Sequence, residues 1–150
     1  MANYDILNLD NQLCFSAYAV SRAITKIYRP FLDKLGITYP QYLVMLVLWE
    51  KNCISLKELG SRLYLDSGTL TPLLKRLEAM GLLERRRNSE DERVLLVTIT
   101  DKGKSMREAA LNVPENIVKA IDTDFGELLE LKQRLDTLLK NIHEKEENQD

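Results

Sequence analysis

The sequence predicts a mainly α-helical protein that carries one small β-hairpin. Apolar residues recur at three- and four-residue intervals over most of the chain, a period typical of helices. One stretch differs, because residues 82–87 and 93–99 have the pattern of two strands joined by the polar residues 88–92. A chain of 150 residues is long enough to bury a core. We therefore expect a single domain, residues 1–150, organised around residues 55–99.

The central stretch, residues 55–99, begins with two short helices. Ser55 and Glu58 form a capping-box pattern at the start of the first helix, and Gly60 allows another helix to approach closely. The chain then turns at residues 64–66, where Asp66 or Ser67 can cap the second helix, and Gly81 ends that helix. Helix, tight turn, helix and hairpin in this order predict a winged helix-turn-helix. Its apolar faces comprise Leu56, Leu59 and Leu63 in the first helix and Leu70, Leu73, Leu74 and Leu77 in the second.

The second helix has the composition of a recognition helix. Its outer face is small or polar at the start and basic farther along, as entry into a DNA major groove from the helix N-terminus requires. Arginines surround the hairpin tip and can reach phosphates or a minor groove, and Asp91 is placed to hold Arg93 by a charge-assisted bond. A charged hairpin alone is usually a solvated surface, so the prediction of DNA binding depends on the whole combination. The expected DNA-contacting residues are Ser67, Thr69, Thr71, Lys75, Arg76, Arg85, Arg86, Asp91 and Arg93.

Charge and composition limit the other function classes. The net charge is −2, but residues 115–150 hold ten acidic against five basic residues, which leaves 16 basic against 13 acidic residues in 1–114. Specificity for DNA must therefore depend on placed contacts more than on bulk charge. Two cysteines and one histidine give no disulfide framework or metal site, and no cofactor motif is present. Without an apolar span or a signal-peptide pattern, we expect a cytoplasmic protein that is not an enzyme.

Amphipathic helices flank the central stretch. We expect a helix over residues 9–35, capped by Asp10, with two adjoining apolar stripes that one neighbour cannot cover; Pro30 should kink or break it and Gly36 should end it. A helix starting at Thr38-Tyr39-Pro40 should be buried over residues 43–49, and Cys53 should lie in the connection that follows. The two stripes of the first helix comprise Leu13, Ala17, Val20, Ile24, Ile27 and Phe31, and Cys14, Tyr18, Ser21, Thr25, Tyr28 and Leu32.

The C-terminal part should form further helices. A helix opened by residues 100–103 should turn Met106, Ala109, Ala110 and Val113 inward and be interrupted at Pro114. The last helix repeats apolar residues at Phe125, Leu128, Leu131, Leu135, Leu138 and Ile142. These helices could simply complete the core of a monomer. We favour a homodimer held by residues 1–35 and 101–146, because a helix-turn-helix reads pseudo-palindromic half-sites of double-stranded operator DNA through a two-fold dimer.

The motif DSGTLTPLLKRLE, followed by GLLERRR and DER, resembles the MarR family of winged-helix regulators over nearly the whole chain. QLCF at residues 12–15, Tyr28 before PFL and LGITYPQY at residues 35–42 are similar to the branch that senses organic hydroperoxides. The resemblance implies a dimeric repressor that releases its operator when an N-terminal cysteine is oxidised. By position, Cys14 would be that cysteine, with Tyr18, Tyr28 and Tyr39 in the sensor pocket. Since no cysteine lies in the C-terminal half, the chain resembles the subclass that depends on a small thiol.

Without the resemblance, Cys14 would be taken for an ordinary core cysteine. Helix geometry adds one inference about its pocket. Tyr28 is 14 residues beyond Cys14, which is about 21 Å along a straight helix. If the two side chains touch, Tyr28 therefore comes from the partner chain. Two alternatives stay open: a regulator controlled by a reversible small ligand, with Cys14 structural, and a thiol peroxidase, which is weaker because the chain offers no resolving cysteine.

Overall fold

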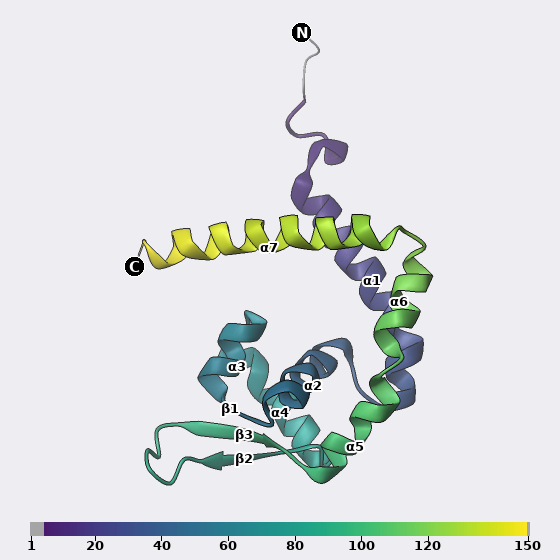
Figure 1. Cartoon of the computed structure of the whole chain (residues 1–150). Helices are drawn as coiled ribbons and strands as arrows, with labels where there is room; N and C mark the ends of the chain where they lie inside the picture. Colours follow the sequence, from purple (N-terminus) through teal and green to yellow (C-terminus); the bar gives the residue numbers. More distant parts are fainter. Residues whose placement is uncertain (1–4, 150) are drawn as a thin grey trace. The chain divides into compact units, whose positions relative to one another are not determined.

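The computed structural model describes residues 5–149 (Figure 1). The described chain forms two compact units, one up to Val113 and one from Pro114, and each is described by itself. The expectation of a single domain over residues 1–150 stays a prediction. In order, the elements are the 3-10 turn η1 (Leu9–Asn11), α1 (Leu13–Leu35), α2 (Tyr39–Lys51), β1 (Cys53–Ser55), α3 (Leu56–Leu63), α4 (Ser67–Ala79), β2 (Leu83–Arg87), β3 (Leu95–Ile99), α5 (Asp101–Ala110), α6 (Val113–Ile121) and α7 (Phe125–Glu147).

The first long helix starts later than the sequence predicted. The side chain of Asn8 accepts a hydrogen bond from the backbone N–H of Asp10. Asn8 thus caps a separate 3-10 turn that precedes the helix. α1 then begins at Leu13 behind Gln12, whose side chain makes no capping bond. The expected Asp10 cap is therefore wrong. Pro30 does not break the helix, because α1 continues past it to Leu35, and the alternative expectation of a kink stays a prediction.

Helices α2, α3 and α4 supply most of the core of the first unit. Thr38 and Gln41 form a reciprocal capping box at the start of α2, which the sequence reading missed. The buried centre of this helix was predicted correctly, although Leu46 faces outward. Gly36, at φ 71°, ends α1 as expected. The fully buried leucines and other large side chains of this core are Leu32, Val44, Met45, Leu48, Leu59, Leu70, Leu74, Leu77, Leu82, Leu83 and Val97.

The turn between α3 and α4 is fixed by local geometry. Ser55 caps α3 by accepting from the N–H of Glu58, and Tyr64 ends it in the left-handed conformation at φ 55°. A Cβ on Gly60 would lie 2.7 Å from the carbonyl oxygen of Leu65, so only glycine fits beneath this turn. Asp66 then caps α4. The predicted helix-turn-helix is confirmed.

The β-hairpin belongs to a three-stranded antiparallel sheet with the order β1-β3-β2. Cys53 lies in the edge strand β1, opposite Thr98, rather than in an irregular connection as predicted. Three residues gave too short a pattern to identify this strand. The connection from β2 to β3 spans residues 88–94, because β3 begins only at Leu95. Arg93 therefore lies in the tip loop, not in a strand as predicted.

The segment after β3 begins with a well-fixed turn. Thr100 caps α5 by accepting from the N–H of Gly103, and Gly103 and Ala110 are buried. Ala109 is exposed, so its predicted inward position is wrong: the helix ends at Ala110 and turns only part of the predicted stripe inward. The interruption falls at residues 111–112, and Pro114 is the second residue of α6, where a missing N–H costs little.

Helix α7 makes up most of the second unit and has 23 residues. Figure 1 shows it as one uninterrupted helix. Asp124 caps it. Its predicted apolar stripe exists as a pattern but is largely exposed, and no residue of this helix is buried. Large exposed apolar side chains on a regular stripe are typical of an interaction surface. The exposed members of the predicted stripe are Phe125, Leu131, Leu135, Leu138 and Ile142, whereas Leu128 is half-buried; Leu129, which was not predicted, is also exposed.

Candidate nucleic-acid interface and thiol site

The outer face of α4 presents the predicted side chains. Asp66 accepts a 2.7 Å bond from the N–H of Thr69, and this bond lowers the pKa of the Asp66 carboxyl, so the helix keeps an ionised cap. Thr71 is half-buried and its hydroxyl donates to the carbonyl of Ser67. The other predicted members of the face are exposed: Ser67, Thr69, Lys75 and Arg76. An exposed polar start and basic end can form hydrogen bonds to base edges and phosphates.

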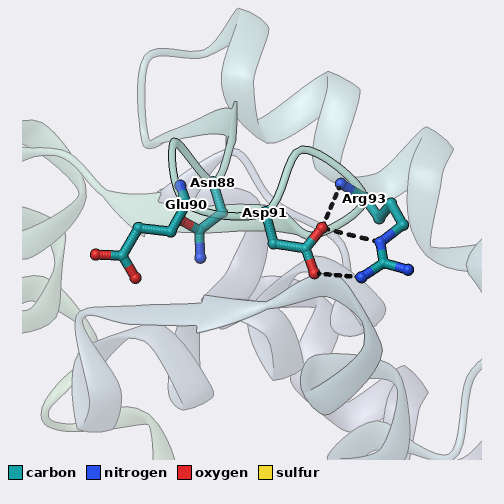
Figure 2. Close-up of polar contacts among 4 residues, drawn as sticks. All are labelled: Asn88, Glu90, Asp91 and Arg93. Atoms are coloured by element: carbon teal, nitrogen blue, oxygen red, sulfur yellow. Dashed lines mark hydrogen bonds and ion pairs between the residues drawn. The ribbon is translucent and has the colours of Figure 1, made fainter.

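The wing tip is ordered by its own side chains (Figure 2). Asn88 Oδ1 accepts from the N–H of Glu90 at 3.0 Å, and the N–H of Asn88 donates to the carbonyl of Val94. Asp91 accepts from Arg93 Nε at 3.0 Å and from its second terminal nitrogen at 3.2 Å, which confirms the predicted contact. Side-chain exposure is 90% for Arg93 and 39% for Asp91. The tip therefore presents a guanidinium whose direction is fixed.

The remaining wing arginines differ in their surroundings. Arg85 forms an ion pair with Glu78, whose Oε2 lies 2.9 Å from Nε and 2.8 Å from a terminal nitrogen, and the backbone N–H of Arg85 donates to Oε1 of Glu78. These bonds lower the pKa of the Glu78 carboxyl. Arg86 pairs with Glu84 at 2.9 Å and stays largely exposed. Arg85 thus joins α4 to β2, a role that the sequence pattern did not indicate.

Both cysteines are free and exposed. Cys14 is the second residue of α1, and Tyr18 stands one turn later, 62% exposed, with the guanidinium of Arg22 5.4 Å from its ring centre. Cys53 opens β1, where its Sγ lies 3.2 Å from the hydroxyl of Thr98, which donates to it. The two thiols therefore occupy different elements of the first unit.

Tyr28 and Tyr39 meet at the other end of α1. Their ring centres are 4.9 Å apart, and Tyr42 lies 5.7 Å from Tyr28 and 6.4 Å from Tyr39. Burial, together with the two neighbouring phenols, raises the pKa of Tyr28 to about 12, and burial also raises the pKa of Tyr39. Both phenols therefore keep their protons near neutral pH and can donate hydrogen bonds. Sequence reasoning missed Tyr42, although its place one turn after Tyr39 could have indicated it.

The structure brings two of the predicted pocket tyrosines together but does not bring Cys14 to them. Cys14 and Tyr28 lie on the same unbroken helix, 14 residues apart, which corresponds to about 21 Å. Within one chain, the thiol and the phenol donors therefore lie far apart. A shallow groove of about 740 Å³ follows α1 between these ends, lined among others by Tyr18, Arg22, Lys26, Arg29 and Tyr39.

Residues 5–149 contain no group of three or more His, Cys, Asp or Glu side chains that could hold a metal ion. Over the same residues, no helix has the length and apolar character needed to cross a bilayer.

Comparison with known proteins identifies the family. Residues 26–110 match the family model described as transcriptional regulator SarA/Rot. The chain is 49% identical to the organic hydroperoxide resistance transcriptional regulator of Bacillus subtilis, over 95% of this chain and 97% of that protein. AbfR of Staphylococcus epidermidis, solved in a reduced form bound to DNA, is 45% identical, with a TM-score of 0.78 and coverage of 91% and 93%.

The likeness extends to a more distant regulator. A mutant of MarR from E. coli, solved with operator DNA, has a TM-score of 0.79 at 27% identity, over 90% of this chain and 99% of that one. These relatives are regulators rather than enzymes. The matched core, the helix-turn-helix and the wing agree, and the chain therefore belongs to the MarR/SarA family of winged-helix transcriptional regulators, as a homologue of the organic hydroperoxide resistance regulator.

Proposed function

We propose that this chain is a homodimeric repressor in the cytoplasm that binds a pseudo-palindromic operator and releases it when an organic hydroperoxide oxidises Cys14. The observation that carries the proposal is the separation of Cys14 from Tyr28 along α1, together with the packing of Tyr39, at the start of α2, against Tyr28. A second chain can complete the site at each end, with its tyrosines beside the first chain's thiol. The sensor then lies in the interface that sets the spacing of the two recognition helices.

Exposed apolar surface supports the dimer. Leu13 is 67% exposed, and Phe125 and the stripe of α7 are also open to solvent. Apolar area of this extent gains free energy when a partner covers it. In the dimer, the two α4 helices would enter successive major grooves, about 34–36 Å apart, while the two Arg93 side chains reach the flanking minor grooves.

The first chemical step is the attack of a thiolate on a peroxide. The Cys14 sulfur would donate an electron pair to the terminal oxygen of ROOH, the O–O bond would break, and the alkoxide would take a proton to leave as ROH. Sulfur is oxidised to the sulfenate and the peroxide is reduced. Phenol protons from Tyr28 and Tyr39 favour this step, because hydrogen-bond donors stabilise the attacking thiolate.

The second step would consume the sulfenic acid. A small cellular thiol RSH attacks the Cys14 sulfur, an S–S bond forms, and the oxygen leaves as water. Cys53 is a poor partner within one chain, because it sits in β1 with its sulfur hydrogen-bonded to Thr98, and the two thiols remain free. A mixed disulfide inserts several atoms into a packed interface, which responds by moving its elements. The recognition helices would then lose the spacing that the operator requires.

The groove along α1 favours one alternative, in which a reversibly bound ligand controls the regulator and Cys14 has only a structural role. Arg22, Lys26 and Arg29 would suit a small anionic ligand there. A DNA-shift assay with operator separates the two functions. We expect cumene hydroperoxide with a small thiol to release the parent protein, and we expect Cys14→Ser to bind the operator and ignore the oxidant. A Cys14→Ser protein that still releases DNA would overturn the proposal.

A further inference from the structure

Trp49 connects two helices that are far apart in the sequence. Its indole N–H donates a 2.9 Å hydrogen bond to the carbonyl of Gly103, so the end of α2 is tied to the first turn of α5. Trp49 is half-buried and Gly103 is buried. A partly buried hydrogen bond is costly to break without a replacement. The position of α5 is therefore coupled to that of Trp49.

The first turn of α5 is in turn fixed to the joint between α4 and the wing, which we define as residues 80–82. The hydroxyl of Thr100 donates to the carbonyl of Gly81 and accepts from the N–H of Gly103. Lys102 Nζ donates to the carbonyl of Met80 at 2.7 Å, which satisfies a carbonyl at the end of the recognition helix. The N–H of Thr100 also bonds to the carbonyl of Leu82.

Close packing leaves the first turn of α5 little freedom to slide against the joint. A Cβ on Gly103 would lie 2.2 Å from the carbonyl oxygen of Leu82 and 2.7 Å from the Ile99 side chain. The two backbones thus touch at Gly103, and a shift of α5 must be transmitted to the joint or break its bonds. The joint sets how the recognition helix and the wing are placed relative to each other.

The other side of Trp49 faces the tyrosine cluster. Its ring meets Tyr42 edge to face, with the ring centres 6.3 Å apart. Tyr42 lies 5.7 Å from Tyr28, which lies 4.9 Å from Tyr39. Contiguous contacts therefore run from the phenols of the proposed sensor through Trp49 and Gly103 to the joint. All of these residues belong to the first unit of the chain.

We infer that Trp49 is a positioning residue that transmits the state of the sensor tyrosines to the joint between the recognition helix and the wing. The inference rests on the proposed function and deepens it. An adduct beside Tyr28 and Tyr39 displaces their rings, Tyr42 passes the shift to Trp49, and the Gly103 bond carries it to α5. The joint then changes, and with it the fit of both DNA-reading elements.

The first test is Trp49→Phe, which keeps a ring and removes the N–H. Operator dissociation constants are measured before and after treatment with cumene hydroperoxide and a small thiol, and Cys14 conversion is checked by intact mass. We expect affinity in the reduced state within about threefold of the parent and an oxidation-induced loss of affinity that is at least about fivefold smaller, within ordinary allosteric coupling. A fully converted Trp49→Phe protein that loses affinity as strongly as the parent overturns the inference.

A pair of variants at Thr100 keeps the test independent of the folding of Trp49→Phe. Thr100→Val removes the hydroxyl bond to Gly81, whereas Thr100→Ser keeps it, and only Thr100→Val should lose the response. Equal responses from both would count against the inference. If the parent itself does not release operator, the proposed function has failed; if the parent responds and the variants respond equally, only the inference has failed.

The fluorescence of Trp49 can be measured directly, because Trp49 is the single tryptophan of the sequence. Its fluorescence emission should change when the parent or Cys53→Ser is converted at Cys14, and should not change in Cys14→Ser under the same treatment. Unchanged emission in a parent sample that has released operator would contradict a path through this ring.

Discussion

Asp91 holds Arg93 by three hydrogen bonds, since its carboxylate accepts from the backbone N–H at 3.1 Å, from Nε at 3.0 Å and from a terminal guanidinium nitrogen at 3.2 Å. Hydrogen bonds from Arg93 also hold the pKa of the Asp91 carboxyl below its usual range. An exposed arginine that is ordered in this way loses less side-chain entropy when it enters a groove. We therefore expect Arg93 to make a specific contact with DNA.

Arg93→Ala should weaken operator binding by about 1–3 kcal/mol, as expected for the loss of a specific contact. Asp91→Asn should weaken it in the same direction, because the guanidinium is then free to rotate. Fluorescence anisotropy with labelled operator measures both. Arg107→Ala, which removes an equal charge from the exposed side of α5, is the matched control. Parental binding by Arg93→Ala at near-physiological salt would exclude the assignment.

Glu78 should contribute to folding as well as to the placement of the wing. Glu78→Gln removes the charge from an ion pair whose side chains are 21% exposed at Arg85 and 35% exposed at Glu78. After allowance for solvent screening, we expect the free energy of unfolding to fall by about 1 kcal/mol in urea titrations. Glu84→Gln is the control, because its pair with Arg86 is mostly exposed. An equal loss of unfolding free energy in both variants would show that the Glu78–Arg85 pair stabilises the fold no more than the exposed Glu84–Arg86 pair does.

The dimer can be tested on the exposed stripe of α7. Leu135→Glu places a charge where we expect a partner to cover the leucine, and a buried uncompensated charge costs several kcal/mol. Sedimentation should show dissociation constants for the dimer raised at least about tenfold, with weaker operator binding. Gln133→Glu makes a charge change on the opposite side of the helix and should leave the dimer intact. A Leu135→Glu protein as dimeric as the parent would contradict this interface.

The phenols of Tyr28 and Tyr39 should matter for the oxidation rate. Burial raises the pKa of both, so they act as donors and not as anions near neutral pH. Because a hydrogen bond to a charged group is worth about 1.5–3 kcal/mol, Tyr28→Phe or Tyr39→Phe should slow Cys14 oxidation about tenfold or more. Stopped-flow mixing with hydroperoxide measures the rate. Tyr64→Phe, in the turn of the helix-turn-helix, is the control and should react like the parent. If Tyr28→Phe and Tyr39→Phe both react at the parental rate, neither phenol has the proposed role.

Residue patterns predicted the helix-turn-helix well because its signals are local. Asp66 and Gly81 act at single positions, and the leucines of α4 repeat with the helix period. The Asp91–Arg93 contact was likewise predictable, since the partners lie only two positions apart in the chain. The resemblance to the MarR family supplied the candidate role of Cys14, which composition alone would have placed in the core.

Long-range contacts could not be predicted in this way. Strand β1 is three residues long and exists because β3 pairs with it, and the Arg85–Glu78 and Trp49–Gly103 contacts join elements that the chain brings together only on folding. Ala109 was misplaced because the packed face of α5 runs through its neighbour Ala110, which is buried while Ala109 is exposed. The expected cap at Asp10 was wrong because Asp10 lies inside a separate 3-10 turn capped by Asn8, and α1 begins only at Leu13 without a side-chain cap.

The central claim, that a thiol adduct on Cys14 releases the operator, is tested most directly by intact mass on the operator-free and operator-bound fractions of one oxidised sample. Cumene hydroperoxide and a small thiol of known mass are added, and the fractions are separated before digestion and mapping. The account predicts one thiol adduct per chain on Cys14 in the released fraction, with Cys53 unmodified. A Cys14–Cys53 disulfide in the released protein, or release with no adduct beyond one or two oxygens, would contradict it.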